Sequence, residues 1–376
     1  MSAKIDKWAM AGGATGTIGG PGPTRRHFLA QMATVGAALV AGEWSAAQSE
    51  AGPRRIDVHH HFKPKSYADF LDAHNQVSAG IWTLAADLED MDKSGVATAI
   101  LSITTPMFGF ASNEETRTAV RKCNDDAARL RDDHPGRFGV FAIFNLDDTE
   151  GALKEIEYAM DTLKCDGMCV FSSYGDKWLG YPSFAPVYEE LNRRKTVVYV
   201  HPTLAKCCLN FPALFESTVP NEFSMIEFGT DTTRAIADLI FSGTTTRFSD
   251  MIWIFSHAGG NMPFAIERFL IGNSAEVVPG IVTKGVNHAP LKNPPKGVLY
   301  ELRKLYYDTA QTANPVAMQA LKQVVPVSQI LFGTDYWYRT AQETVQGLTT
   351  CKVFNAEELR AINRGNAERI LPRFRT

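Results

Sequence analysis

The sequence lacks the marks of several protein classes. Its six cysteines show no zinc-ribbon spacing, and we expect them mainly as buried small residues, although pairing cannot be read from sequence. A formal net charge of −3 over 376 residues gives no reason to expect nucleic acid as a partner. Beyond the N-terminal region, no apolar stretch approaches a membrane span, and no internal repeat or low-complexity tract occurs. These absences favour a globular protein that acts on a small molecule.

The N-terminal 47 residues have the order of parts seen in an export signal. Arg25 and Arg26 form a twin-arginine pair, residues 28–41 are apolar, and Ser45, Ala46 and Ala47 offer small residues for cleavage. The apolar run is too short to span a membrane comfortably. We therefore predict a twin-arginine signal peptide and leader at 1–47, a single domain at 48–376, and a periplasmic or secreted location.

Short apolar runs alternate with amphipathic segments along the rest of the chain. The runs are nearly continuous rather than alternating, which is typical of strands buried on both faces of a parallel sheet. We predict strands at 56–62, 98–104, 138–144, 167–172, 196–201, 251–257, 305–308 and 329–333. Helical periodicity predicts helices at 84–93, 113–133, 149–163, 184–194, 232–242 and 262–270. Eight strands alternating with helices favour an α/β fold of the (β/α)8 TIM-barrel type, with a doubly wound open sheet as the alternative.

Histidine and aspartate occur where the predicted strands end. The sequence has only nine histidines, and four of them end predicted strands, followed by two aspartates at later strand ends: His59, His61, His201, His257, Asp308 and Asp335. In such barrels the carboxyl ends of the strands form the active site. A shared site at this end of the barrel explains the placement of all six residues.

Three imidazoles and one carboxylate make a ligand set for a divalent metal. His59 and His61 stand two apart and point to the same face of a strand, whereas His60 points the other way. With His201 and Asp335 they suit Zn²⁺, the expected ion, and would also accept Mn²⁺, Fe²⁺ or Co²⁺. The fourth strand ends without a lysine or glutamate to bridge a second ion, so we predict one metal.

Other residues are candidates for chemistry and substrate binding. We assign His257 to general acid–base catalysis, with Asp335 as its helper, because histidine titrates near neutrality. Asp308 is expected either to orient a ligand or His257, or only to cap its strand. Arg268 could clamp a substrate carboxylate or form an ordinary salt bridge. Aromatic residues of 202–230, including Phe223, together with Trp337 and Tyr338, would cover a planar substrate or serve as packing for a subunit contact.

These motifs together resemble a known family. The segment 57–62, His201-Pro202, residues 256–260 and residues 332–335 look like the amidohydrolase superfamily. They are similar to its branch around aminocarboxymuconate-semialdehyde decarboxylase, which includes 6-methylsalicylate and resorcylate decarboxylases. The resemblance implies a deformed TIM barrel, one divalent metal, loss of carbon dioxide without an organic cofactor, and a homodimer in which Arg268 reaches the neighbouring subunit's substrate.

Three functions are compatible with this pattern. The first is non-oxidative decarboxylation of an aromatic or unsaturated carboxylic acid by a carbon–carbon lyase. The second is hydrolysis of a lactone or amide by metal-bound hydroxide, which needs the same ligands. The third is a metal-binding or scaffold protein without catalysis. We favour the first, and a comparison of carbon dioxide release with acid release would separate it from the second.

Overall fold

The computed structural model describes residues 54–76, 80–106, 108–208, 222–271, 278, 280 and 294–375. The predicted leader at 1–47 and its boundary lie outside these ranges. No helix within them is long and apolar enough to cross a membrane.

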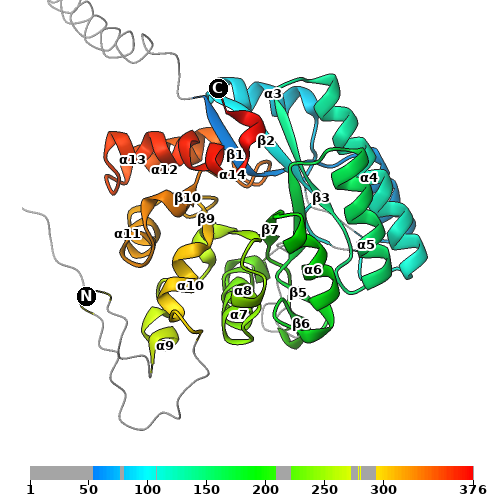
Figure 1. Ribbon diagram of the computed structural model, residues 1–376. Helices are drawn as coiled ribbons and strands as arrows, with labels where there is room; N and C mark the ends of the chain where they lie inside the picture. The colour runs from blue at the N-terminus through cyan, green and yellow to red at the C-terminus, as the bar shows by residue number, and fades with distance from the viewer. Residues whose placement is uncertain are drawn as a thin grey trace, which may run out of the picture. The chain divides into compact units, whose positions relative to one another are not determined.

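Eight parallel strands form one sheet that curves into a barrel (Figure 1). In spatial order they are β1 (Arg55–His61), β2 (Val96–Ser102), β3 (Phe138–Ile143), β4 (Gly167–Phe171), β7 (Val197–His201), β8 (Ile252–Phe255), β9 (Tyr306–Asp308) and β10 (Ile330–Leu331). The amide of Val58 in β1 donates to the carbonyl of Phe332 just after β10 at 3.0 Å, which joins the two ends of the sheet. The (β/α)8 prediction is confirmed, and all eight predicted strands are present.

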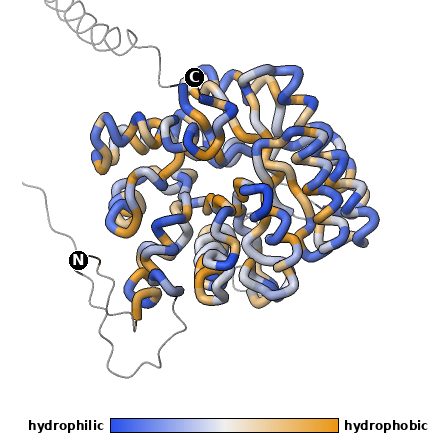
Figure 2. Tube along the Cα trace, in the orientation of Figure 1, coloured by the Kyte–Doolittle hydropathy of each residue, from blue (hydrophilic) through white to orange (hydrophobic). Residues whose placement is uncertain are grey.

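Helices surround the strands, and orange and blue residues alternate along them as expected for amphipathic helices (Figure 2). They are α2 (Lys65–Ala73), α3 (Leu84–Lys93), α4 (Asn113–Asp133), α5 (Thr149–Glu157), α6 (Ala185–Arg193), α7 (Glu227–Phe241), α8 (Thr244–Arg247), α9 (Ile266–Leu270), α10 (Val298–Lys304), α11 (Pro315–Val324), α12 (Ala341–Thr350), α13 (Ala356–Arg360) and α14 (Asn366–Ile370). A small hairpin, β5 (Ser173–Tyr174) and β6 (Lys177–Trp178), follows β4.

Three predicted helix boundaries were wrong. The helix at 149–163 ends as α5 at Glu157 and continues as a π-helical turn, in which Leu163 donates to the carbonyl of Tyr158. A π-helical turn contains about one residue more than an α-helical turn, and a search for a period of 3.6 residues does not predict where such a turn occurs. Helix α7 begins five residues earlier than predicted, and α9 is shorter than 262–270 because residues 260–265 form turns.

The barrel interior is apolar at one end and polar at the other. Alternate residues of the strands, such as Ile56, Val58, Ile100 and Tyr199, pack inside with the C-terminal residues Ile370, Leu371 and Phe374. The C-terminal segment thus packs with the apolar interior of the barrel. The histidines and aspartates identified from the sequence belong to the opposite end, where the strands terminate.

His60 is a buried ionic centre rather than a surface residue. It faces away from His59 and His61, as predicted, but its side chain is buried between two carboxylates. Its Nδ1 atom lies 2.9 Å from Asp57 Oδ2, and its Nε2 atom lies 2.8 Å from Asp87 Oδ1. Burial by itself would lower its pKa, but the two carboxylates outweigh burial and raise the pKa of His60 to about 10. The imidazole is therefore a cation at neutral pH.

Substituting His60→Ala is expected to destabilise the fold by about 3–5 kcal/mol, because two carboxylates lose their buried partner. Urea denaturation at pH 7 measures this. A matched control is His74→Ala, which removes a partly exposed pair with Glu115 and should cost less than about 1 kcal/mol. Because the folded pKa is raised, the stabilisation by His60 is complete below its ordinary pKa of 6.5 and is lost as the pH rises through about 10. Equal losses for the two variants would contradict the assignment.

Candidate active site

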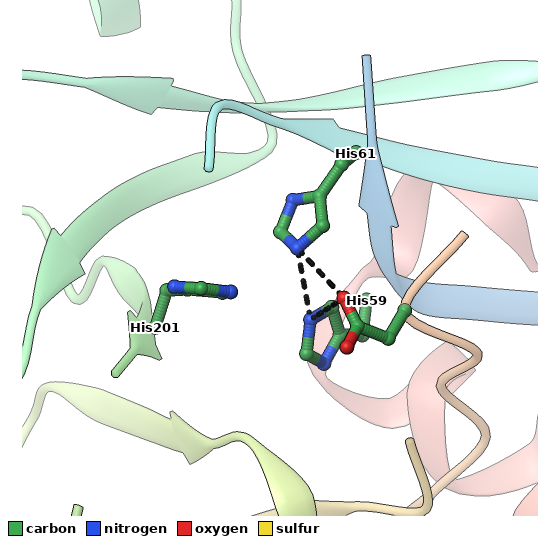
Figure 3. Close-up of side chains that lie close together, drawn as sticks. His59, His61 and His201 are labelled. Atoms are coloured by element: carbon green, nitrogen blue, oxygen red, sulfur yellow. Dashed lines mark hydrogen bonds and ion pairs between the residues drawn. The ribbon is translucent and has the colours of Figure 1, made fainter. Parts of the chain in front are cut away.

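Four side chains predicted as metal ligands converge at the carboxyl end of the barrel (Figure 3). β1 supplies His59 and His61, the last residue of β7 is His201, and Asp335 follows β10. One potential ligand atom from each lies within 4.8 Å of the others, and all four residues are buried. The structure thus brings together donors that are separated by up to 276 residues, since 335 − 59 = 276.

Each imidazole is oriented so that its Nε2 atom points toward the centre of the cluster. Each Nδ1 atom is engaged on the other side by a fixed oxygen: Asp308 Oδ2 at 2.8 Å from His59, the Pro202 carbonyl at 2.7 Å from His201, and Ser102 Oγ at 3.2 Å from His61. Such partners fix the ring orientation and the tautomer of metal-binding histidines. The Nε2 atoms of His59 and His61 are only 3.1 Å apart.

The charges of the cluster suit a cation. Burial lowers the pKa of His61 and takes that of His201 well below its ordinary value, so both rings are neutral and have a lone pair to give. Against burial, Asp308 and Asp335 raise the pKa of His59 to about 10. Burial also pushes the pKa of Asp335 upward, but His59 and His257 hold it well below the ordinary value. A divalent ion can replace the proton of His59 between these two carboxylates.

One buried oxygen has ion-pair contacts but no well-aligned hydrogen bond. Asp335 Oδ1 lies 3.2 Å from His59 Nε2 and 3.1 Å from His61 Nε2, and neither ring nitrogen makes a well-aligned hydrogen bond to it. A buried unsatisfied carboxylate oxygen is costly unless an ion or donor meets it. Three imidazoles that can each be neutral, together with this oxygen, fit a single Zn²⁺ or Mn²⁺ ion.

His257 lies beside the cluster, two residues beyond β8. Its Nε2 atom is 3.3 Å from Asp335 Oδ2, and its backbone amide donates to Asp308 Oδ1 at 2.8 Å. Asp308 therefore contacts both residues that it was expected to orient, His59 and His257. The ring of His257 is only partly buried, because it lines a cavity of about 260 Å³.

This cavity is the space in which a substrate would meet the cluster. Its described lining is neutral apart from the site residues, and it contains no lysine or arginine. Besides His201, His257 and Asp335 it includes hydroxyl, amide and apolar groups: Thr104, Thr105, Ser224, Met225, Phe228, Asn261, Gln311, Thr312 and Tyr338. A cavity of this size suits a small ring compound.

Of the residues predicted to contact substrate, some line the cavity and others do not. Arg268 is exposed on α9 and does not line the cavity of its own chain. Trp337 packs against Gly80 and stacks on Tyr338, and of these two aromatic residues it is Tyr338 that lines the cavity. The side chain of Phe223 lies outside the described residues, but Phe228 of the same predicted aromatic segment reaches the cavity.

Gln311 is a site residue that the sequence reasoning missed. It stands three residues after Asp308 at the end of β9, lines the cavity, and donates through Nε2 to Asp335 Oδ2. Its position just past a strand end was the available signal. A neutral amide does not stand out among histidines and aspartates, and the hydrogen bond depends on how β9 and β10 pair.

Comparison with known proteins agrees with this geometry. The family described as amidohydrolase matches residues 56–373. The 6-methylsalicylic acid decarboxylase of Aspergillus aculeatus is 35% identical over 290 residues, which cover 75% of this chain and 84% of the relative. A decarboxylase of Penicillium terrestre is 32% identical over 337 residues, or 85% of this chain and 96% of the relative.

Solved structures share the fold at low identity. The 5-carboxyvanillate decarboxylase of Sphingomonas paucimobilis superposes with a TM-score of 0.71 at 21% identity, covering 85% of this chain and 99% of that chain. A dihydroxybenzoic acid decarboxylase of a Polaromonas species, solved with manganese and 2-nitroresorcinol, gives 0.70 at 18% identity and covers 86% and 98%. From the family match and the relatives above 30% identity, this chain belongs to the amidohydrolase family, in the branch that contains 6-methylsalicylic acid decarboxylases.

Proposed function

We propose that this protein is a metal-dependent, non-oxidative decarboxylase of a small aromatic or unsaturated carboxylic acid. The observation that carries the proposal is the buried cluster of three histidines and one aspartate, with His257 beside it, at a cavity of about 260 Å³. The relatives at 32–35% identity with printed activities are all decarboxylases, and two are named for 6-methylsalicylic acid. A hydroxylated benzoic acid is therefore the first substrate class to test.

The residues that would hold the metal are His59, His61, His201 and Asp335. Zinc fits this nitrogen-rich set, while the manganese bound by the fold neighbours is the alternative. When bound, a divalent ion supplies Lewis-acid stabilisation of an oxygen that gains negative charge. At the end of β4, Ser172 and Ser173 donate to Asp231 instead of facing the cluster, which supports one ion rather than two.

His257 is placed to deliver the proton that decarboxylation requires. As the carbon–carbon bond breaks, carbon dioxide leaves. The electron pair of the broken bond remains on the substrate carbon. A proton from His257 Nε2 then forms the new carbon–hydrogen bond. Asp335 is held ionised well below its ordinary pKa, so it supports an imidazolium at 3.3 Å instead of donating a proton itself. General acids of this kind contribute about 10²–10⁴-fold in rate.

A homodimer would supply the guanidinium group that the described lining of the cavity lacks. Arg268 is exposed on α9, four residues after Phe264, which is 66% exposed. A surface with a large exposed aromatic residue next to arginine has the composition of a protein interface. We propose that Arg268 of one copy binds the substrate carboxylate in the cavity of the other.

Complementation between two impaired variants, measured at a substrate concentration well below the KM of Arg268→Ala, tests this arrangement. Arg268→Ala should raise KM by roughly 10–100-fold, because a charge-assisted hydrogen-bonded contact is worth about 1.5–3 kcal/mol. Subunit exchange between Arg268→Ala and His257→Ala proteins should restore activity, since one site per mixed dimer then holds both groups. A monomeric mass in solution, or no recovery after exchange, contradicts the arrangement.

The proposed reaction is tested by a panel of hydroxylated benzoic acids, muconate-like acids, lactones and amides. Carbon dioxide release from an acid, without net acid production from lactones or amides, is expected. Acid release from a lactone or amide, with no carbon dioxide from any acid, would contradict the decarboxylase proposal and support a hydrolase. Turnover of neither class would favour a binding protein.

We also propose export of the folded protein through the twin-arginine route. The support is the arginine pair, apolar stretch and small residues of 1–47. N-terminal sequencing of protein recovered outside the cytoplasm should begin near residue 48. A start before residue 24 would contradict the proposal.

A further inference from the structure

Three neighbouring site residues have left-handed backbone conformations that side chains rarely adopt. His257, Gln311 and Asp335 have φ angles of 52°, 53° and 65°, and each follows one of the consecutive strands β8, β9 and β10. Such conformations outside glycine persist where the surrounding structure enforces them, and they cluster at functional sites. Two of these residues already have proposed roles, which leaves Gln311 to be explained.

The two oxygens of Asp335 have different surroundings. Oδ1 lies at ion-pair distance from His59 and His61 and accepts no well-aligned hydrogen bond. Oδ2 accepts from Gln311 Nε2 and lies 3.3 Å from His257 Nε2. A carboxylate can rotate about its last bond, so without a donor on Oδ2 both oxygens could turn toward the same ion.

We propose that Gln311 is a positioning residue that sets how Asp335 binds the metal. Its amide holds Oδ2 away from the ion, so that Oδ1 alone is a ligand and Oδ2 remains an acceptor for His257. A neutral amide is suited to this task, because lysine or arginine at the same position would add a charge that repels the cation. Since the inference rests on the proposed metal site, its test must also examine that site.

The substitution that tests the donor alone is Gln311→Met. Methionine keeps the length of the side chain and has a similar energetic cost in the left-handed backbone conformation, but it lacks the N–H donor. Gln311→Asn keeps an amide and tolerates a left-handed backbone better, yet it is one methylene too short to reach. The matched control is Gln329→Met. Gln329 donates to the Lys304 carbonyl at 3.1 Å just before β10, at the opposite end of the barrel from the cluster.

Each protein is stripped of metal and titrated with Co²⁺ alone, and its visible absorption reports the coordination number. Wild type and Gln329→Met should bind one ion per chain with the same spectrum. Gln311→Met and Gln311→Asn should also bind one ion, about 10-fold or more weakly, with a weaker band typical of a higher coordination number. Circular dichroism of all four proteins checks that the fold is retained.

Several outcomes would overturn the assignment. An unchanged spectrum and affinity in Gln311→Met would show that the donor does not position Asp335. Wild-type affinity and spectrum in Gln311→Asn, whose amide is too short to reach Asp335, would likewise show that this hydrogen bond does not set how Asp335 binds the metal. A wild-type spectrum with only an altered KM would make Gln311 a substrate contact. If wild type binds no Co²⁺, the proposed metal site itself fails, whereas failure in the variants alone removes only the role of Gln311.

Discussion

Replacing His257 with alanine is expected to lower the rate of carbon dioxide release by about 10²–10⁴-fold while one metal ion per chain is retained. The loss follows because His257 is the titratable group beside the cluster that faces the cavity and does not belong to the predicted ligand set. Its Nε2 atom is 3.3 Å from Asp335 Oδ2, which can stabilise the imidazolium form. Steady-state kinetics with the best acid of the panel, together with elemental analysis, measure both quantities.

A second substitution guards against a backbone effect at this position. His257 has a φ of 52°, and asparagine adopts this region more readily than alanine does. His257→Asn should therefore lose as much rate as His257→Ala, because neither can carry a proton. His134→Ala, at the end of α4, is the distant control and should keep wild-type turnover. Carbon dioxide released by the alanine variant at the wild-type rate would rule out the assignment.

Removing the metal is expected to reduce carbon dioxide release by at least about 10³-fold. A Lewis acid contributes several kcal/mol to the stabilisation of developing charge, and each 1.4 kcal/mol is about tenfold in rate. Dialysis against a strong chelator, followed by addition of Zn²⁺ or Mn²⁺ in separate samples, measures the loss and its recovery. The ion found in untreated protein and the ion that restores more activity should agree, which decides between zinc and manganese.

The same experiment has a structural readout. An ion that binds only the folded protein raises its melting temperature, so the chelated protein should melt earlier than the reloaded one. Metal affinity should also fall as the pH is lowered, because protons compete for the imidazoles. Preparations proven free of metal that still release carbon dioxide at the untreated rate would contradict a metal-dependent reaction.

Much of the architecture was predictable because it depends on local patterns. Strands buried on both faces must be apolar along their whole length, so eight apolar runs indicated the eight strands of the barrel sheet. The predicted start of helix α4 at Asn113 is confirmed, and the structure gives the reason, because Ser112 and Glu115 form a capping box there. The rule that barrel sites lie at strand ends then selected His59, His61, His201 and Asp335 from a chain of 376 residues.

The sequence by itself determined which residues belong to the end of the barrel that carries the chemistry, because strand ends can be found from burial and spacing. Only the tertiary structure decided what each of them contacts. His60 acquires its charge from Asp57 and Asp87, and Gln311 acquires a role from Asp335, through contacts between elements that are distant in sequence or differently paired. Hydrogen bonds form over a few tenths of an ångström, which hydrophobic periodicity does not resolve. The packed barrel therefore turned a set of strand-end residues into a site with one carboxylate oxygen between two imidazoles and one neighbouring histidine that lines the cavity.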